Sequence, residues 1–388
     1  MKHLSKKVVG HLFFYFGMQL FSLVISILSY IVPKDKSLFV FGSVKGSAYR
    51  GNTRALFEFL SRKSDVNAIF LTQKEAVYGE IQKGGNKSSY GFFRNMSLLL
   101  RARYVFIESV LLDVSPFYFL LGRFSIINLW HGTPLKKIGQ DSKDLNPYYK
   151  LIISIMDKRF KLILANDELT KKHVSSAFRN KNVEALGYPR NDTMFCENAS
   201  SQMLKSLNYK KIILFCPTFR DNSVFAPFGE SFLSELNEYL SRSNYIFFIK
   251  EHPNKSVLNY AGYSNIQALP KSVDEVSDVY NVIDILIVDY SSVMFDFVLT
   301  GKPIIYYPFD YETYVAHDRE IYYDYFEELP GPFAKNENDL FNLIRTDLEW
   351  FDDSGYQKKY MKFRDKFNFF QDNKSSERVY NYIISNIK

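Results

Sequence analysis

The stretch Val288-Asp-Tyr-Ser-Ser-Val-Met-Phe-Asp-Phe-Val-Leu-Thr-Gly-Lys-Pro-Ile-Ile-Tyr-Tyr-Pro-Phe-Asp-Tyr311 decides the fold of this chain. An apolar run, Ile283 to Val288, predicts a buried strand in front of it. Ser291 and Ser292 stand where a helix begins, Thr300-Gly301 ends that helix, and an apolar second strand follows. A strand, a helix and a strand in this order predict a unit of parallel sheet.

The start of this predicted helix is also a candidate anion site. The first turn of a helix presents free backbone N–H groups and the positive end of a dipole, both of which stabilise a bound anion. The hydroxyls of Ser291 and Ser292 add donors suited to phosphate. The alternative interpretation is that Ser291 only caps the helix.

Strands and helices alternate along the rest of the chain, and the pattern occurs twice. We expect strands at 37–42, 67–71, 104–108, 125–130 and 161–165 in a first half, and at 212–216, 245–250, 285–288 and 303–307 in a second. The predicted helices cover 53–61, 72–103 with a Gly-Gly break at 84–85, 146–158, 167–178, 230–241, 273–281 and 291–300. This alternation predicts an α/β fold with two doubly wound parallel-sheet domains that face each other across a cleft. The expected divisions are a membrane-associating segment at 1–36, a first domain at 37–190, a linker at 191–209, and a second domain with C-terminal helices at 210–388.

Composition favours an anionic partner and a reducing compartment. The formal charge is +7 and the pI is about 9.0, which favours nucleic acid, phospholipid headgroups or a phosphorylated substrate. Nucleic acid has the weakest support, because the basic residues are scattered and most aromatic residues fall inside apolar runs. The two cysteines, Cys196 and Cys216, make no disulfide framework.

The segment from Val8 to Pro33 supports membrane association. It carries no charged side chain apart from His11, and lysines flank it on both sides. It is long enough to cross a bilayer, but a cleaved signal peptide is disfavoured because no small-residue cleavage site follows. We favour a helix or shallow hairpin in the cytoplasmic leaflet, which keeps both basic flanks near anionic headgroups. A true span and a buried core helix are the alternatives.

Four loops at the ends of predicted strands carry the candidate chemistry. They are Trp130-His-Gly-Thr-Pro-Leu-Lys-Lys137, Cys216-Pro-Thr-Phe-Arg-Asp221, Lys250-Glu-His-Pro253 and the Asp289 to Asp296 unit. In the second loop Arg220 can bond phosphate or ribose, although a turn with a surface Arg220–Asp221 pair is the favoured interpretation. One histidine follows a strand in each half, His131 and His252. If the halves face each other, these two imidazoles suit acid–base or electrostatic help to phosphoryl transfer. A metal site is disfavoured, because the spacing lacks an H-E-x-x-H form and the loops hold few paired carboxylates, and no cofactor is expected.

Several ordered motifs together resemble one family. They are His131-Gly-Thr-Pro-Leu135, Gly187-Tyr-Pro-Arg190, Pro217-Thr-Phe-Arg220, Glu251-His-Pro253, Asp289-Tyr-Ser-Ser292 with Asp296, Gly301-Lys-Pro303 and Asp372-Asn-Lys-Ser-Ser-Glu-Arg378. The chain is similar over these motifs to the CDP-glycerol glycerophosphotransferase family of teichoic-acid and capsule synthesis. The resemblance implies a GT-B fold and a peripheral membrane enzyme on the cytoplasmic face of the cell membrane. This sequence differs from the motif of the family at Lys250, where an arginine is common. Lysine keeps the positive charge, but it cannot make the bidentate contact with phosphate that arginine makes.

The resemblance also implies the reaction and its residues. Glycerol phosphate, or ribitol phosphate, would pass from a CDP-alditol to a hydroxyl of a lipid-linked acceptor, with release of CMP. His131 and His252 would be catalytic. The implied CDP-glycerol site consists of His131, Gly132, Thr133, Pro134, Leu135, Arg190, Pro217, Thr218, Lys250, Glu251, His252, Ser291, Ser292 and Asp296. Two alternatives stay open: a nucleotide-sugar glycosyltransferase on the same frame, and a non-catalytic membrane-bound assembly subunit.

Overall fold

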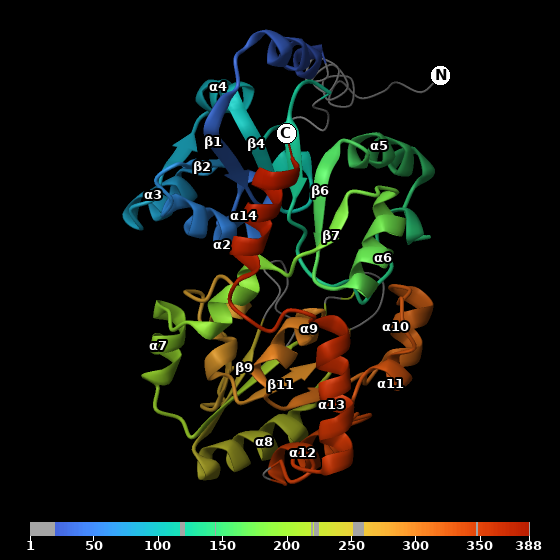
Figure 1. Ribbon diagram of the computed structural model, residues 1–388. Coiled ribbons are helices and arrows are strands. Elements are labelled where there is room, and N and C mark those ends of the chain that lie inside the picture. Colours follow the sequence, from blue (N-terminus) through green and yellow to red (C-terminus); the bar gives the residue numbers. More distant parts are fainter. Residues whose placement is uncertain are drawn as a thin grey trace, which may run out of the picture.

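The computed structural model describes residues 20–116, 121–143, 145–218, 220, 225–250, 260–346 and 348–387. It confirms the expected α/β architecture, with two parallel-sheet domains stacked one above the other (Figure 1).

The first domain is built on a seven-stranded parallel sheet in the order β3-β2-β1-β4-β5-β6-β7. Its strands are β1 Asp35–Gly42, β2 Asn67–Thr72, β3 Ser88–Tyr90, β4 Ala102–Ile107, β5 Ser125–Asn128, β6 Phe160–Ala165 and β7 Val183–Ala185. Its helices are α2 Gly51–Ser61, α3 Glu75–Lys83, α4 Phe92–Arg101, α5 Pro147–Asp157 and α6 Glu168–Phe178, with short 3-10 turns η1 Val44–Gly46, η2 Leu111–Asp113 and η3 Gly139–Asp141. Because helices cover both faces, the central strands read as continuous apolar runs.

The second domain repeats this plan on a five-stranded parallel sheet in the order β10-β9-β8-β11-β12. Its strands are β8 Lys211–Cys216, β9 Tyr245–Ile249, β10 Ile266–Ala268, β11 Ile285–Val288 and β12 Ile304–Tyr306. The connection from the first domain holds η4 Pro189–Phe195 and α7 Ala199–Lys205, and the domain itself holds α8 Glu230–Ser243, η5 Val276–Val282, α9 Val293–Phe297, η6 Val298–Thr300, α10 Tyr311–His317, α11 Tyr325–Glu328, α12 Glu337–Arg345 and α13 Ser354–Phe367. In both sheets the strand order reverses beside the first strand, which is where α/β sheets bind ligands.

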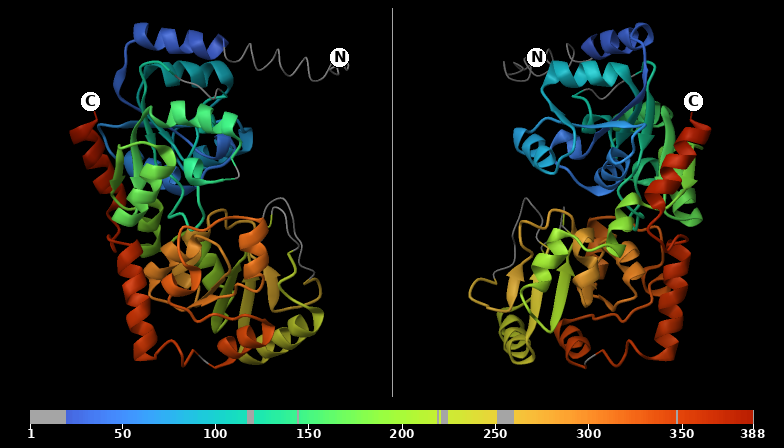
Figure 2. Two further views of the ribbon diagram at one scale, coloured as in Figure 1. Left: turned by 90° about the vertical axis from the view of Figure 1, so that its right-hand side faces the viewer. Right: turned by 60° about the vertical axis from the view of Figure 1, so that its left-hand side comes forward.

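The last helix, α14 (Ser375–Asn386), crosses back to the first domain. Val379, Ile383 and Ile387 are buried in the core of that domain, and the Tyr104 hydroxyl donates to the Ile387 carbonyl at 2.8 Å. Figure 2 shows α13 beside the second domain and α14 beside the first. The sequence pattern grouped all C-terminal helices with the second domain, because helical periodicity does not say which sheet a helix covers.

Residues 20–31 form a helix with an unusual distribution of side chains, seen at the top of Figure 1. Its inner face consists of Ile25 and three serines, Ser22, Ser26 and Ser29, all of them buried, and the backbone N–H of Arg123 donates to the Ser29 hydroxyl at 2.7 Å. Its exposed face is apolar and consists of Leu20, Phe21, Leu23, Val24, Ile27, Leu28, Tyr30 and Ile31. In the part of the chain that the structure describes, no helix has the length and apolar content needed to cross a bilayer. The rest of the expected membrane segment, residues 1–19, lies outside the described residues.

Candidate functional site

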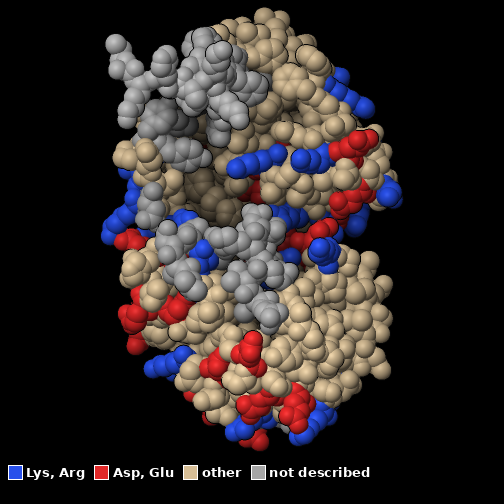
Figure 3. Space-filling view, turned by 180° about the vertical axis from the view of Figure 1, so that it is seen from behind, with Lys and Arg blue, Asp and Glu red and all other residues tan. Residues whose placement is uncertain are grey.

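A cavity of about 610 Å³ lies between the two domains. The first domain contributes loops after β1, β4 and β5, including Lys45, Glu108 and His131, and the second contributes Lys250 and Glu275. Figure 3, which shows the molecule from behind, has a visible hollow just above the junction of the domains, with basic side chains near it. The predicted cleft at the carboxyl ends of the strands is therefore present, and we call it the interdomain cavity.

His131 lies at the junction of this cavity and a smaller one. The smaller cavity, of about 200 Å³, is bounded by the 130–136 loop, Tyr290 and Ser292, and His131 borders both spaces with an exposed side chain. Trp130 has φ 53° and Gly132 has φ 141°, so the chain turns sharply on both sides of the histidine. A non-glycine residue at positive φ stores strain that the surrounding structure must hold.

Two side chains hold this strained loop by its carbonyl groups. Asn52, at the start of α2, donates through Nδ2 to the carbonyls of Leu129 (3.1 Å) and Trp130 (2.6 Å). Arg190 donates through Nη1 to the His131 carbonyl at 2.5 Å. A β-carbon on Gly132 would lie 2.7 Å from Arg190 Nη2, so glycine leaves the room that the guanidinium occupies.

Arg190 also forms a buried ion pair with Asp296 of α9, through Nη2 and Oδ2. The two side chains are 13% and 2% exposed. Asn191 Nδ2 donates to the other carboxylate oxygen of Asp296 at 3.3 Å. The linker, the histidine loop and the second domain are thus joined through one carboxylate. Asp296 is not among the described residues that line the two cavities.

The electrostatics of the site keep His131 neutral at pH 7. Two effects lower the pKa of the imidazole below its ordinary value. The larger is desolvation by the surrounding protein, which disfavours the charged form, and the smaller is repulsion by the charge of Arg190. A neutral imidazole has an unprotonated nitrogen available to accept a proton, which is what a general base requires.

The serine-rich helix start is shorter than the sequence predicts. α9 covers only Val293–Phe297 before it tightens into the 3-10 turn η6. Ser292, not Ser291, occupies the N-cap position, and its side chain makes no capping hydrogen bond within the described residues. Ser292 faces the 130–136 loop across the smaller cavity, so the structure brings together two of the four predicted loops. A five-residue helix has a weaker dipole than the ten-residue helix expected at 291–300.

The loop after β8 is organised by internal contacts. The Thr218 N–H, next to Pro217, donates to both carboxylate oxygens of Asp289 at 2.8 and 3.0 Å. Arg220 is 3% exposed and pairs with Asp289 (2.9 Å) and Asp310 (2.8 Å). The surface position predicted for Arg220 is wrong, because the side chain is buried and its charge is satisfied by two carboxylates inside the second domain. Asp221 lies outside the described residues, and a phosphate contact of Arg220 stays a prediction.

Lys250 borders the interdomain cavity as expected, whereas Glu251, His252 and Pro253 lie outside the described residues. The distance between the two predicted catalytic histidines therefore stays untested. Within the residues that the structure describes, no three His, Cys, Asp or Glu side chains are grouped as metal ligands would be.

Two carboxylates that sequence reasoning missed meet at the start of α2. Glu108 accepts from the N–H groups of Asn52 (3.1 Å) and Thr53 (3.0 Å), and burial raises its pKa to about 7. Glu275, from the second domain, accepts from the Gly51 N–H at 3.0 Å. Acidic groups stabilise a helix N-terminus. The contact of Glu275 with the start of α2 therefore stabilises the association of the two domains. Only the position of Glu108 at the end of a predicted strand signalled its role.

Comparison with known proteins gives a consistent result. A family model described as CDP-Glycerol:Poly(glycerophosphate) glycerophosphotransferase matches residues 24–385. A teichoic acid poly(glycerol phosphate) polymerase of Bacillus spizizenii is 28% identical over 93% of this chain and 95% of its own length. A teichoic acid poly(ribitol-phosphate) polymerase of the same species is 30% identical over 80% of this chain and 53% of its own. The solved wall teichoic acid polymerase TagF superimposes with a TM-score of 0.78 at 22% identity, covering 96% of this chain and 97% of that one.

Proposed function

The chain belongs to the CDP-glycerol:poly(glycerophosphate) glycerophosphotransferase family, and on that premise we propose that it transfers an alditol phosphate from a CDP-alditol to a hydroxyl of a membrane lipid-linked acceptor. The product is a unit of teichoic acid or of a related surface polymer, and CMP is released. Glycerol phosphate is the first candidate and ribitol phosphate the second, because the two relatives named above make one polymer each. The observation that carries the proposal is His131, exposed and neutral between two cavities at the domain junction.

The reaction exchanges one P–O bond for another. The acceptor hydroxyl attacks the phosphorus that bears the alditol, and the bond from that phosphorus to the bridging oxygen breaks, so that CMP departs with the bridging oxygen. His131 accepts the proton of the attacking hydroxyl. His252 stabilises the charge on the departing phosphate, helped by Lys250 at the cavity wall.

The donor is held by the two loops that meet at the smaller cavity. Residues 131–135 and Ser292 border that space, and together with Ser291, Pro217, Thr218 and Glu251 they bind the CDP-alditol. Arg190 lines the interdomain cavity, where it can contact the donor, and its ion pair with Asp296 fixes the backbone that carries His131.

The helix at 20–31 attaches the enzyme to the cytoplasmic face of the membrane. Its apolar side chains other than Ile25 point outward while its serines pack inward, which is the reverse of a surface helix in a water-soluble protein. A contiguous apolar face of this kind is stabilised in the interface of a bilayer. This attachment places the active site near a lipid-linked acceptor.

Release of CMP tests the assignment directly. Purified protein is given CDP-glycerol or CDP-ribitol with membrane lipid from the host, and CMP is measured. We expect His131→Ala and His252→Ala each to lower CMP release about 10²- to 10⁴-fold, with His317→Ala as the matched control, because the His317 side chain is exposed on α10. Near-normal turnover in both active-site variants contradicts the proposal. Consumption of UDP- or GDP-sugars instead identifies a glycosyltransferase, and CDP binding without CMP release identifies a non-catalytic subunit.

A further inference from the structure

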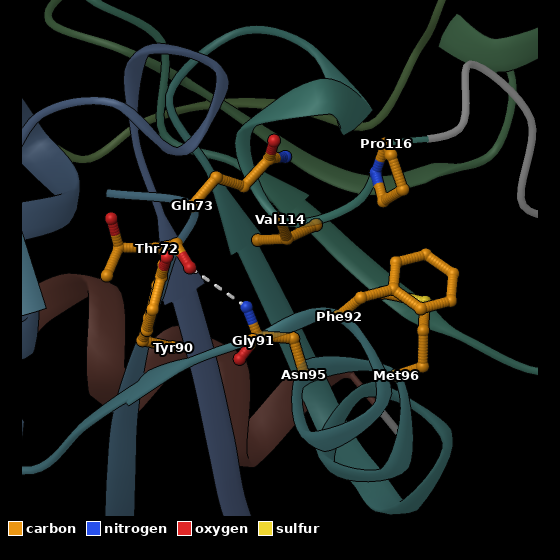
Figure 4. A pocket seen from close by; sticks show the side chains of 9 residues that line it. All are labelled: Thr72, Gln73, Tyr90, Gly91, Phe92, Asn95, Met96, Val114 and Pro116. Carbon is orange, nitrogen blue, oxygen red and sulfur yellow. Dashed lines mark hydrogen bonds between the residues drawn. The ribbon is translucent and has the colours of Figure 1, made fainter. Parts of the chain in front are cut away.

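A third cavity, of about 260 Å³, lies in the first domain where β2 and β3 end and α4 begins. Figure 4 shows its walls, which include Gln73, Tyr90, Phe92, Asn95 and Val114. We call it the α4 cavity. None of the residues in the implied CDP-glycerol site borders it.

The α4 cavity lies between the membrane-facing helix and the interdomain cavity. On one side the ring of Phe92 lies 5.7 Å from the ring of Phe21, which is part of the exposed apolar helix. On the other side Val114 directly follows Asp113, which borders the interdomain cavity. A molecule anchored in a membrane at the 20–31 helix and extended toward His131 therefore passes this cavity.

The wall between the two cavities is thin. The carbonyl of Gly46, in the η1 turn, accepts hydrogen bonds from the Thr72 hydroxyl and the Gln73 N–H, each at 2.8 Å. Lys45, the neighbour of Gly46, borders the interdomain cavity, whereas Gln73 borders the α4 cavity. One turn of chain thus separates them, and a basic side chain stands on that turn.

The start of α4 supplies donors for an anion. No side chain among the described residues caps this helix, its first turn holds no acidic residue, and Gly91 takes the cap position with φ 105°. A β-carbon built on Gly91 would meet no atom within 4 Å, so the space in front of the helix is open. The first N–H groups and the dipole of a ten-residue helix favour a phosphate-type anion there.

A second, independent feature favours a hydroxyl group in the same place. Asn95 is 6% exposed, and its Nδ2 donates to the Thr72 carbonyl at 3.0 Å (Figure 4). Its Oδ1 has no hydrogen-bond partner among the residues that the structure describes. A buried carbonyl oxygen without a donor is costly, and a ligand hydroxyl removes that cost.

We propose that the α4 cavity binds the polyol-phosphate units of the acceptor chain that lie behind its reacting hydroxyl. Such a chain repeats the two groups that the cavity needs, an anionic phosphodiester and a free hydroxyl. The phosphodiester lies at the α4 N-terminus and the hydroxyl donates to Asn95, while the carbon backbone of the polyol packs on Tyr90 and Phe92. This inference rests on the proposed function, because it assumes a polyol-phosphate acceptor.

Binding of a soluble probe tests the inference without any turnover. The probe is synthetic tri(glycerol phosphate), and its affinity is measured by titration calorimetry with the full-length protein in detergent. We expect Gln73→Glu, which adds one negative charge at an exposed position of the wall, to weaken binding about tenfold, and Tyr90→Ala to weaken it severalfold. Gln82→Glu is the matched control, because Gln82 is exposed on the same domain but borders a neighbouring groove instead. The KM for the probe as acceptor should rise in parallel, with no change in the KM for CDP-glycerol.

The outcomes separate this inference from the proposed function. Failure of the wild-type protein to bind the probe overturns the inference, as does equal binding by the wild-type protein and Gln73→Glu. An equal loss in Gln82→Glu also overturns it, because a general charge effect then explains the result. A third outcome is that the probe binds and Gln73→Glu weakens this binding, but the protein never consumes CDP-alditols. That result supports the binding of polyol phosphate in the α4 cavity and contradicts the proposed reaction.

Discussion

Replacing Arg190 by alanine removes one half of the buried ion pair that joins the linker, the histidine loop and α9. Asp296 is then left 2% exposed, and Asn191 is the one remaining hydrogen-bond partner of its carboxylate among the residues that the structure describes. Loss of one partner from a buried pair costs about 3–5 kcal/mol, and loss of the hydrogen bond to the His131 carbonyl costs about 1 kcal/mol more. Because the carboxyl can escape part of this cost by binding a proton, we expect a decrease of about 4 kcal/mol in the free energy of unfolding at pH 8.

The decrease in the free energy of unfolding caused by Arg190→Ala should be smaller at low pH than at high pH. Burial already raises the pKa of Asp296, and the charge of Arg190 opposes that rise. Without the arginine, the folded-state pKa rises further above that of the unfolded chain. A group of this kind stabilises the fold at low pH and loses that contribution as pH rises through its folded pKa. The substitution should therefore cost less at pH 5 than at pH 8.

Urea unfolding of Arg190→Ala, Asp296→Asn and the double variant measures this effect at both pH values. We expect a coupling energy of about 2–3 kcal/mol between the two positions. The control is Arg242→Ala, which removes an exposed pair with Glu238 and should cost less than about 0.5 kcal/mol. A cost below about 1 kcal/mol for Arg190→Ala, or additive effects in the double variant, would refute the role given to this pair.

Three further results are expected. The lowered pKa of His131 keeps the base unprotonated in mild acid, so the acid limb of the pH–rate profile should lie below pH 6.5, and a limb above pH 7 argues against this base. Ile27→Asp, on the outward face of the 20–31 helix, should lower binding to anionic vesicles at least tenfold, whereas Met361→Asp, exposed on α13, should leave sedimentation with vesicles unchanged. Gly132→Ala should lower the free energy of unfolding by about 1–3 kcal/mol, since it adds strain at φ 141° and crowds Arg190; an unchanged urea midpoint would contradict the close contact.

The central strands could be predicted because their apolar runs are long and both faces are covered. The sequence does not predict the three-residue edge strands β3, β7 and β10, because each contains polar residues and is too short for a pattern, whereas the equally short edge strand β12 is an unbroken apolar run, Ile304–Tyr306. Residues 88–90 were assigned to a helix for this reason. The 273–281 helix exists as the 3-10 turn η5, which local sequence does not distinguish from an α-helix.

The loops of the site could be predicted, but the contacts inside it could not. Loops at the carboxyl ends of parallel strands lie at one edge of the sheet, which is why the sequence could predict that His131 and Lys250 border the cavity between the domains. The pairing of Arg190 with Asp296, across 106 positions, depends on how the two domains meet. The burial of Arg220 between Asp289 and Asp310 likewise depends on three segments of the second domain. The periodicity of a single segment does not indicate which side chains of distant segments will pair.

The return of α14 to the first sheet makes that domain discontinuous in sequence. A fragment that stops at residue 190 leaves uncovered the hydrophobic groove filled by Val379 and Ile383, so we expect it to aggregate when expressed alone. The two domains are also joined by two separate chain passages, one through η4 and one between α13 and α14. Because the chain crosses between the domains at two places, we expect the interdomain cavity to open by rotation of one domain about the line that joins these two crossings.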